Sequence, residues 1–212
     1  MNLIQQLSEY LQKGDEKQVF DLTKQAIEQD IPPEDILNKG LIGGMNVIGE
    51  LFRDHEIFLP DVLLAAKAMY AGMDQLKPIL IKAGIPGMGK VVIGTVQGDL
   101  HDIGKNLVGI MLKGAGFDII DLGNDVPAEQ FVLTAEKENA PVIGMSALLT
   151  TTMPAMKQVT DLVKEKNLQN KIKTIVGGAP LSEQSAIEMG ADAYGFDAAN
   201  AVIRVKALMG VS

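Results

Sequence analysis

The sequence predicts an α/β protein in which an N-terminal four-helix bundle cap precedes a doubly wound, parallel five-stranded sheet of the Rossmann-like, flavodoxin-like kind. Three observations predict this fold. Residues 1–86 show apolar residues at helical spacing only, and residues 84–89 read Gly-Ile-Pro-Gly-Met-Gly, as in a linker. Short apolar runs then alternate with helical stretches. We therefore expect a helical cap domain over residues 1–86 and a Rossmann-like domain over residues 90–212.

The cap domain is expected to contain four amphipathic helices. Apolar spacing places the first before Gly14, and Asp15 with Gln18 resembles a capping box that opens the second, which Pro32 and Pro33 end. The third is expected over residues 35–52 and the fourth after Pro60, a residue that suits a first helical turn. The third contains three glycines, which indicates that a helix or a ligand approaches its backbone closely: Gly40, Gly43 and Gly44.

The second domain is expected to alternate strands and helices. The apolar runs predict strands at residues 91–96, 117–122, 141–145 and 171–176, and a weaker one at 191–194. Helical spacing predicts helices at residues 103–114, 127–138, 152–166, 183–189 and 198–209. In a parallel sheet of this kind ligands bind beyond the carboxyl ends of the strands, so functional residues are expected in the loops there.

Composition excludes several classes of function. A net charge of -8 over 212 residues, without a Lys/Arg-rich block, argues against nucleic-acid binding. The absence of cysteine excludes disulfides, thiolate metal sites and cysteine nucleophiles. No run approaches the roughly 18 uninterrupted apolar residues of a membrane span, and the start lacks a signal-peptide pattern. We expect a cytoplasmic protein without membrane contact, in which any imidazole chemistry uses His55 or His101.

The loop after the first strand carries the strongest candidate for chemistry. Residues two apart in an extended loop project to the same side, so Asp99 can reach the ring of His101. A carboxylate on one imidazole nitrogen fixes the tautomer and leaves the other nitrogen for a metal. Gly104 would admit a bulky ligand at the start of the next helix. An alternative is that Asp99 and the histidine merely cap that helix.

Two other strand ends favour a ligand site. Hydroxyl residues cluster after the third strand, where Ser146, Thr150 and Thr152 lie in one stretch, and Gly177 with Gly178 would leave an open slot after the fourth. No second histidine or cysteine offers a tetrahedral zinc set. A single-histidine site suits a metal that arrives within its own macrocycle.

These spaced motifs resemble those of cobalamin-binding domains of the methionine-synthase type, and especially the stand-alone corrinoid proteins of methylamine, methanol and methoxyarene methyltransferase systems. The signature Asp-x-His-x-x-Gly, Ser-x-Leu, Gly-Gly is present, and the resemblance covers nearly the whole chain. Its members here are Asp99, His101 and Gly104, then Ser146 and Leu148, then Gly177 and Gly178. The stretch from Gly98 to Asn106, Gly-Asp-Leu-His-Asp-Ile-Gly-Lys-Asn, is an especially close match.

The resemblance implies a cobalamin or related corrinoid bound base-off, with His101 on the cobalt. The benzimidazole tail would enter the slot between the Ser-x-Leu and Gly-Gly motifs, with Thr150 among the cofactor-binding residues. In the methionine-synthase pattern a serine six residues past the first serine of Ser-x-Leu completes a His-Asp-Ser relay. Thr152 stands there, and its extra methyl group restricts its rotamer.

The helical part carries the second half of the resemblance. Phe52 and Leu59 align with the pair that covers the methyl face of the cofactor in the resting state. An apolar lid excludes water and oxygen from a reactive cobalt centre. Alternatively, both residues belong to the ordinary core of the bundle. His55 lies among charged neighbours and is expected to be a solvated surface residue.

The resemblance implies a methyl carrier that is not an enzyme on its own. Such a subunit accepts a methyl group on Co(I) from a substrate-specific methyltransferase and presents methyl-Co(III) to a second methyltransferase with a folate- or thiol-type acceptor. A reductive activator protein is a further implied partner, and residues 84–89 would be the hinge that lets the lid move.

Three alternatives remain. The small subunit of a B12-dependent mutase shares the sheet motifs, but it works with a substrate barrel and need not carry this lid. A B12-sensing regulator would add a DNA-binding domain, for which this chain has neither the room nor the basic charge. A flavodoxin-like or receiver domain would bind no corrinoid.

Overall fold

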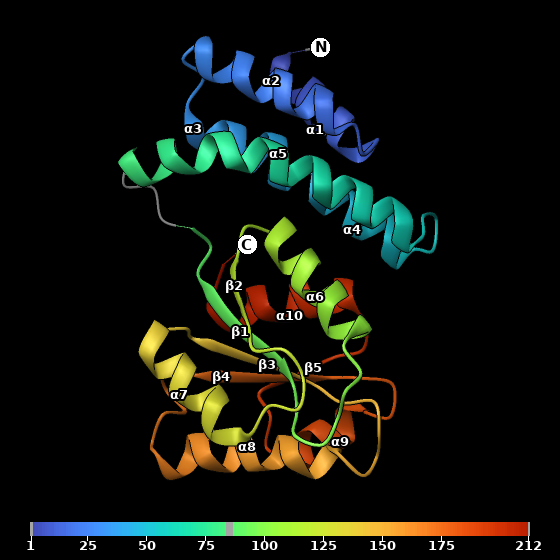
Figure 1. Ribbon diagram of the computed structural model, residues 1–212, viewed down its shortest axis with the longest axis vertical. Helices are drawn as coiled ribbons and strands as arrows, with labels where there is room; N and C mark the ends of the chain where they lie inside the picture. Colours follow the sequence, from blue (N-terminus) through green and yellow to red (C-terminus); the bar gives the residue numbers. More distant parts are fainter. Residues whose placement is uncertain (1, 84–86, 212) are drawn as a thin grey trace. The chain divides into compact units, whose positions relative to one another are not determined.

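The computed structural model describes residues 2–83 and 87–211. The chain forms two compact units, one of Met1–Gly87 with Gly114–Gly116 and the other of Met88–Lys113 with Phe117–Ser212 (Figure 1). The expected linker at residues 84–89 falls partly on residues 84–86, which lie outside the described residues. The expected domain limits at residues 86 and 90 stay a prediction. Within the described ranges, no helix is both long and apolar enough to cross a membrane.

Every regular element in the described part of the first unit is a helix. Its elements are α1 (Leu3–Gln12), α2 (Glu16–Glu28), α3 (Pro33–Asp35), the π-helix η1 (Ile36–Ile42), α4 (Gly43–Arg53) and α5 (Leu59–Ala83). Asn2 and Gln5 form a capping box at the start of α1, and the Asp15 side chain accepts a hydrogen bond from the Gln18 N–H at the start of α2. Pro60 lies in the first turn of α5, as expected.

The stretch expected as one helix over residues 35–52 changes its hydrogen bonding on the way. The N–H of Gly43 reaches back five residues to the Asn38 carbonyl, as in a π-helix. A Cβ at Gly40 would lie 2.7 Å from Leu7 Cδ2, and one at Gly44 would lie 3.0 Å from Leu11 Cδ2. The close neighbour of these two glycines is therefore helix α1 rather than a ligand.

The second unit contains the expected parallel sheet. Its strands are β1 (Lys90–Thr95), β2 (Asp118–Asp121), β3 (Val142–Ser146), β4 (Lys173–Gly177) and β5 (Ala193–Gly195), in the order β2-β1-β3-β4-β5. The connecting helices are α6 (Ile103–Gly114), α7 (Ala128–Glu138), α8 (Met153–Glu165), α9 (Glu183–Glu188) and α10 (Ala198–Met209). All neighbouring strands are parallel, which confirms the predicted fold class.

Helices cover both faces of this sheet and leave its carboxyl edge to the loops. Helices α7, α8 and α9 lie on one face, and α6 and α10 lie on the other (Figure 1). The register pairs Thr95 with Ser146, Ser146 with Gly177 and Gly177 with Gly195. Four strands therefore end together, and the loops that follow β1, β3, β4 and β5 begin at one edge.

Candidate functional site

The loop between β1 and α6 holds a buried carboxylate beside an exposed imidazole. The Asp99 side chain is 0% exposed, whereas that of His101 is 52% exposed. Asp99 Oδ1 accepts hydrogen bonds from the His101 backbone N–H at 3.0 Å and from the ring at Nδ1 at 2.8 Å. The two side chains therefore meet, as their spacing predicts.

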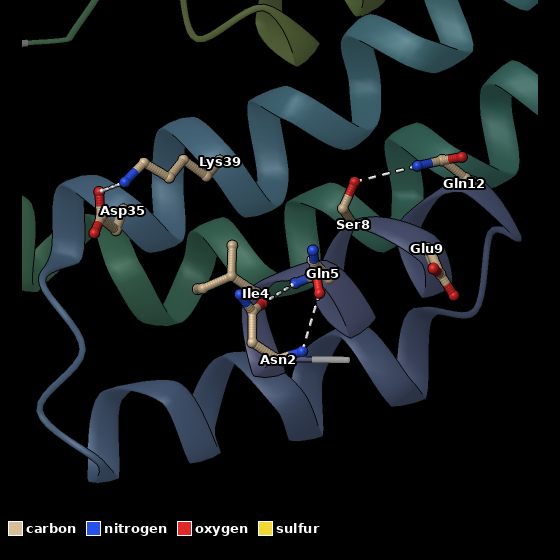
Figure 2. A pocket seen from close by; sticks show the side chains of 8 residues that line it. All are labelled: Asn2, Ile4, Gln5, Ser8, Glu9, Gln12, Asp35 and Lys39. Atoms are coloured by element: carbon tan, nitrogen blue, oxygen red, sulfur yellow. Dashed lines mark hydrogen bonds and ion pairs between the residues drawn. The ribbon is translucent and has the colours of Figure 1, made fainter.

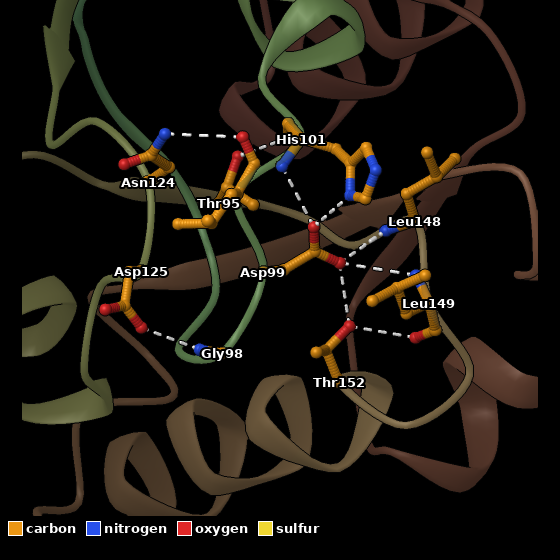
Figure 3. A network of polar contacts seen from close by, with 10 residues as sticks. Thr95, Gly98, Asp99, His101, Asn124, Asp125, Leu148, Leu149 and Thr152 are labelled. Carbon is orange, nitrogen blue, oxygen red and sulfur yellow. Dashed lines mark hydrogen bonds and ion pairs between the residues drawn. The ribbon is translucent and has the colours of Figure 1, made fainter.

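The other oxygen of Asp99 is held by the loop after β3. Asp99 Oδ2 accepts hydrogen bonds from the Leu148 N–H at 2.8 Å, the Leu149 N–H at 3.3 Å and the Thr152 hydroxyl at 2.8 Å (Figure 3). The Thr152 hydroxyl also lies 2.9 Å from the Leu149 carbonyl oxygen, so its single proton has two acceptors within reach. The motifs of two separate strand ends thus converge on one carboxylate.

This environment determines which imidazole nitrogen can bind a metal. Burial by itself would raise the pKa of Asp99, but hydrogen bonds from the backbone of His101 and Leu148, the Thr152 hydroxyl and the imidazole hold that pKa well below its usual range. Asp99 is therefore an anion, and an anion on Nδ1 requires that nitrogen to carry the proton. The lone pair of the neutral ring is then on Nε2, which is the nitrogen available to a metal.

The surroundings of the imidazole are unusually apolar for an exposed surface. Large apolar side chains of the His101 loop, the first turn of α6 and the β3–α8 loop face solvent: Leu100 at 68%, Ile103 at 76%, Leu148 at 42% and Leu149 at 42% exposure. A Cβ at Gly104 would meet nothing within 4 Å. Exposed apolar side chains gathered around a polar group are typical of a binding surface for a large, partly apolar ligand.

A metal bound here has to bring most of its own ligands. Among residues 2–83 and 87–211, no group of three or more His, Cys, Asp or Glu side chains is placed to hold a metal ion. His101 offers one nitrogen, and Asp99 is already occupied by its five donors. A cobalt ion within a corrin macrocycle needs only one axial base from the protein, so the residues present fit such a group.

The remaining sheet-edge residues are placed less simply than expected. Ser146 and Gly177 are paired at the ends of β3 and β4. A Cβ at Gly178, whose φ is +140°, would lie 1.9 Å from the Ala147 carbonyl oxygen. This glycine therefore lets two loops touch, and the expected slot for a cofactor tail stays a prediction. Thr150 lies exposed in the turn before α8.

The expected lid residues belong to the helical unit. Phe52 is half-buried near the end of α4, and Leu59 is 36% exposed at the start of α5. Neither is a fully buried core residue, but their role as a lid stays a prediction. His55 is exposed in the turn after α4, as expected, with a positive φ of 60°.

A second surface depression lies in the helical unit, and its chemistry differs. This pocket of about 510 Å³ is lined by Asn2, Ile4, Gln5, Ser8, Glu9, Gln12, Asp35 and Lys39 (Figure 2). Most of its polar side chains already bond to one another, as Lys39 does with Asp35 at 2.8 Å and Gln12 with Ser8 at 3.1 Å. Because this pocket contains no imidazole and most of its polar side chains already have partners, the His101 loop is the better candidate site.

Several contacts around the site were not predicted from the sequence. The buried Lys105 ammonium lies 2.6 Å from Asp121 Oδ1 and 2.7 Å from Asn106 Oδ1, so it ties the first turn of α6 to the end of β2. The backbone N–H groups of Leu148 and Leu149 leave no side-chain signal in a sequence. Lys105 and Asn106 belong to the Gly98–Asn106 stretch that resembles the corrinoid proteins, and this membership is the only sequence signal that points to them.

Comparisons with known proteins identify the family to which the chain belongs. A family model described as a B12 binding domain matches residues 89–203, and a second model of that description matches residues 3–77. A corrinoid protein of Desulfitobacterium hafniense (strain Y51) is 42% identical over 213 residues, 99% of each chain. Dimethylamine corrinoid protein 1 of Methanosarcina acetivorans is 45% identical over 181 residues, 85% of each chain.

A solved structure is similar over nearly the whole length. A chain in the crystal structure of the methanol:cobalamin methyltransferase complex MtaBC from Methanosarcina barkeri gives a TM-score of 0.88 at 34% identity and covers 99% of this chain and 80% of that one. The parallel sheet and the matched models define a B12-binding α/β domain that follows a helical domain. The chain belongs to the corrinoid protein family.

Proposed function

We propose that this protein is the methyl-carrying corrinoid subunit of a multi-component methyltransferase and is not an enzyme on its own. The observation that carries the proposal is the Asp99–His101 pair, in which a buried anion fixes Nδ1 of an exposed ring and leaves Nε2 for cobalt. The corrinoid, when bound, supplies a cobalt nucleophile that takes a methyl group as a cation equivalent and gives it up in the same form.

In this proposal the residues of the chain ligate the cobalt, orient the imidazole and shield the cofactor. His101 would hold the cobalt through Nε2 when the corrinoid binds base-off and His-on, and Asp99 holds the imidazole ring at 2.8 Å. Thr152 donates to Asp99 and stands where the serine of the related pattern would stand. Leu100 and Ile103, which face solvent, would supply apolar surface to a bound corrinoid.

The named relatives indicate which partners to expect. Relatives of this chain are dimethylamine corrinoid proteins, and a similar chain comes from a methanol:cobalamin methyltransferase complex. The proposal therefore includes a substrate-specific methyltransferase that loads the corrinoid and a second methyltransferase that unloads it to a folate- or thiol-type acceptor. A reductive activator restores the reduced cobalt. Phe52 and Leu59 form the lid between visits of these partners.

The proposal is tested by anaerobic reconstitution of the full chain with hydroxocobalamin. The wild type is expected to bind it and to give the absorption spectrum of a base-off, His-ligated corrinoid. His101→Ala is expected to lose the histidine-ligated spectrum, because its one cobalt-directed nitrogen is gone. His55→Asn is the matched control, since it removes the other histidine and Asn tolerates the positive φ at that position.

A second step tests methyl carriage itself. The reconstituted protein, reduced and treated with isotopically labelled methyl iodide, is expected to retain one light-sensitive methyl group for each bound corrinoid. A colourless wild type would contradict corrinoid binding, and a His101→Ala variant with an unchanged spectrum would contradict the assigned ligand. A protein that binds adenosylcobalamin but retains no methyl group would favour the mutase alternative.

A further inference from the structure

We propose that Asp125, in the β2–α7 loop, is a positioning residue that sets the conformation of the His101 loop, although it makes no contact with the Asp99 carboxylate. The β2–α7 loop is defined here as residues 122–127. The inference rests on the proposed role of His101 as the cobalt ligand and adds a residue to that site. It explains what holds Asp99 itself in place.

Asp125 makes hydrogen bonds to the backbone on both sides of the Gly98–Asp99 peptide. Its carboxylate Oδ1 accepts a hydrogen bond from the Gly98 N–H at 2.7 Å. Its own backbone N–H donates to the Asp99 carbonyl oxygen at 3.0 Å. One residue thus holds the two peptide groups that flank the Gly98–Asp99 peptide, and the contact of Asp125 with Gly98 is visible in Figure 3.

The β2–α7 loop is itself anchored to the end of β1. The Thr95 N–H donates to the Gly123 carbonyl at 2.9 Å, and the Val126 N–H donates to the Thr95 carbonyl at 3.0 Å. The buried Thr95 hydroxyl then donates to the His101 carbonyl at 2.9 Å, and the Asn124 side chain donates to that of Leu100 at 3.3 Å. The β2–α7 loop and Thr95 therefore connect the end of β1 to the backbone of the His101 loop by hydrogen bonds.

The backbone conformation and the exposure of Asp125 indicate that core packing does not explain an aspartate at this position. Its φ is +54°, in the left-handed region, and its side chain is exposed. Asp and Asn tolerate this region better than other residues with a Cβ, and such conformations persist where the surrounding structure imposes them. Since burial does not require an aspartate here, its two contacts with the His101 loop account for the residue.

The direction of the imidazole depends on these contacts. Asp99 Oδ1 accepts hydrogen bonds from both the backbone and the ring of His101, so a movement of the backbone at Gly98 and Asp99 shifts the acceptor for Nδ1. A shifted acceptor redirects Nε2, the nitrogen that ligates cobalt. Asp125 has no role in the chemistry and acts only through this geometry.

Two variants separate the hydrogen bond from backbone strain. Asp125→Gly removes the carboxylate acceptor and relaxes the positive φ, whereas Asp125→Asn keeps an acceptor oxygen and tolerates that φ. Glu129→Gln, which changes an exposed carboxylate in the first turn of α7, is the matched control. Each full-length protein is reconstituted with hydroxocobalamin, and thermal unfolding of the cofactor-free form checks that it is folded.

We expect Asp125→Gly to bind hydroxocobalamin about tenfold more weakly, as for the loss of one charge-assisted hydrogen bond, with a smaller histidine-ligated fraction in its spectrum. Asp125→Asn and Glu129→Gln should keep the wild-type affinity and spectrum. A folded Asp125→Gly variant that matches the wild type would overturn the inference. So would an Asp125→Asn variant as impaired as Asp125→Gly, because asparagine retains the acceptor.

A cofactor-free measurement keeps this inference separate from the proposed function. The chain has two histidines, so the imidazole nitrogen signals of His101 can be assigned by nuclear magnetic resonance against those of His55. The His101 signals are expected to move in Asp125→Gly and to stay in Asp125→Asn. If the wild type fails to bind hydroxocobalamin, the proposed function fails, while unchanged His101 signals in Asp125→Gly would contradict the positioning role alone.

Discussion

At the scale of single residues, Asp99 is the centre of the site because it is a buried anion whose donors are complete. Five groups direct hydrogen atoms at its two oxygens: the N–H groups of His101, Leu148 and Leu149, the Thr152 hydroxyl and the imidazole. An unpaired buried carboxylate would be strongly unfavourable, and these bonds offset its desolvation. The same bonds lock the imidazole.

Asp99→Asn tests how much this arrangement contributes to the fold. The new amide NH₂ has to face either the two donors of His101 or the donors of Leu148 and Thr152, so buried donors meet without an acceptor. We expect the free energy of unfolding in urea at neutral pH to fall by about 1–3 kcal/mol. Asp118→Asn, an exposed change in β2, should leave it unchanged.

The pH dependence of the same pair gives an independent check. The folded-state pKa of Asp99 lies below its unfolded value of about 3.9, so its stabilisation is present above that pH and is lost as the pH falls below it. The difference in unfolding free energy between wild type and Asp99→Asn should therefore shrink on going from about pH 7 to about pH 3. A constant difference would show that the charge contributes nothing.

The residue pairing could be predicted from sequence only in part. The two-residue spacing of Asp99 and His101 correctly predicts their contact, and the hydroxyl of Thr152 does reach Asp99. The donors from Leu148 and Leu149 could not be foreseen, because backbone amides leave no residue-specific pattern. The clamp by Asp125 also escapes prediction, since it depends on a neighbouring strand end twenty-odd residues further along the chain.

At the scale of elements, two glycines of the second unit lie in opposite surroundings: Gly104 at the start of α6 is next to open space, and Gly178 after β4 is in close contact with another loop. A Cβ at Gly104 meets only open space, so Gly104→Ala should leave the cofactor-free fold as stable as before, or more stable by up to about 1 kcal/mol. The Cβ of Gly178→Ala would lie 1.9 Å from the Ala147 carbonyl oxygen at a positive φ, so this change should lower the free energy of unfolding by about 1–3 kcal/mol.

Hydroxocobalamin binding then distinguishes the two glycines. Gly104→Ala is expected to weaken binding despite a sound fold, because its methyl group takes space beside His101 that the ligand needs. Urea unfolding of the cofactor-free proteins and titration of the corrinoid measure the two effects separately. Unchanged affinity in Gly104→Ala would mean that the ligand does not pass over the first turn of α6.

The elements themselves were largely predictable, and one exception is informative. The expected ranges at residues 103–114 and 198–209 coincide with α6 and α10, because apolar periodicity and caps define a helix locally. The range 35–52 was expected as a single helix, but the structure divides it into α3, η1 and α4. Apolar periodicity shows which face of a helix is buried, but it does not show whether each N–H bonds to the carbonyl four or five residues earlier.

At the scale of the whole molecule, each of two units matches a B12 binding domain model of its own. The proposed lid residues Phe52 and Leu59 both lie in the helical unit. Leu59→Ser changes a side chain that is 36% exposed, so the unfolding free energy of the cofactor-free protein should stay within about 0.5 kcal/mol of the wild type.

The reduced corrinoid, by contrast, should be oxidised several-fold faster in Leu59→Ser, because a gap in an apolar lid admits oxygen and water. Phe20→Ser is the control, since it removes another exposed apolar side chain from the helical unit, in α2. Stopped-flow absorption after exposure to air measures the rate. Equal rates in the two variants and the wild type would exclude a shielding role for Leu59.

The π-helix η1 has a consequence for how this chain can diverge. Its i to i−5 bond from Gly43 to Asn38 accommodates one residue more than an α-helical turn would, and one residue corresponds to about 100° of rotation. Deletion of a single residue here would restore uninterrupted α-helical hydrogen bonding. It would also rotate α4, and with it Phe52, relative to α1. The number of residues in η1 therefore determines the rotation of α4 about its axis, whichever side chains α4 carries.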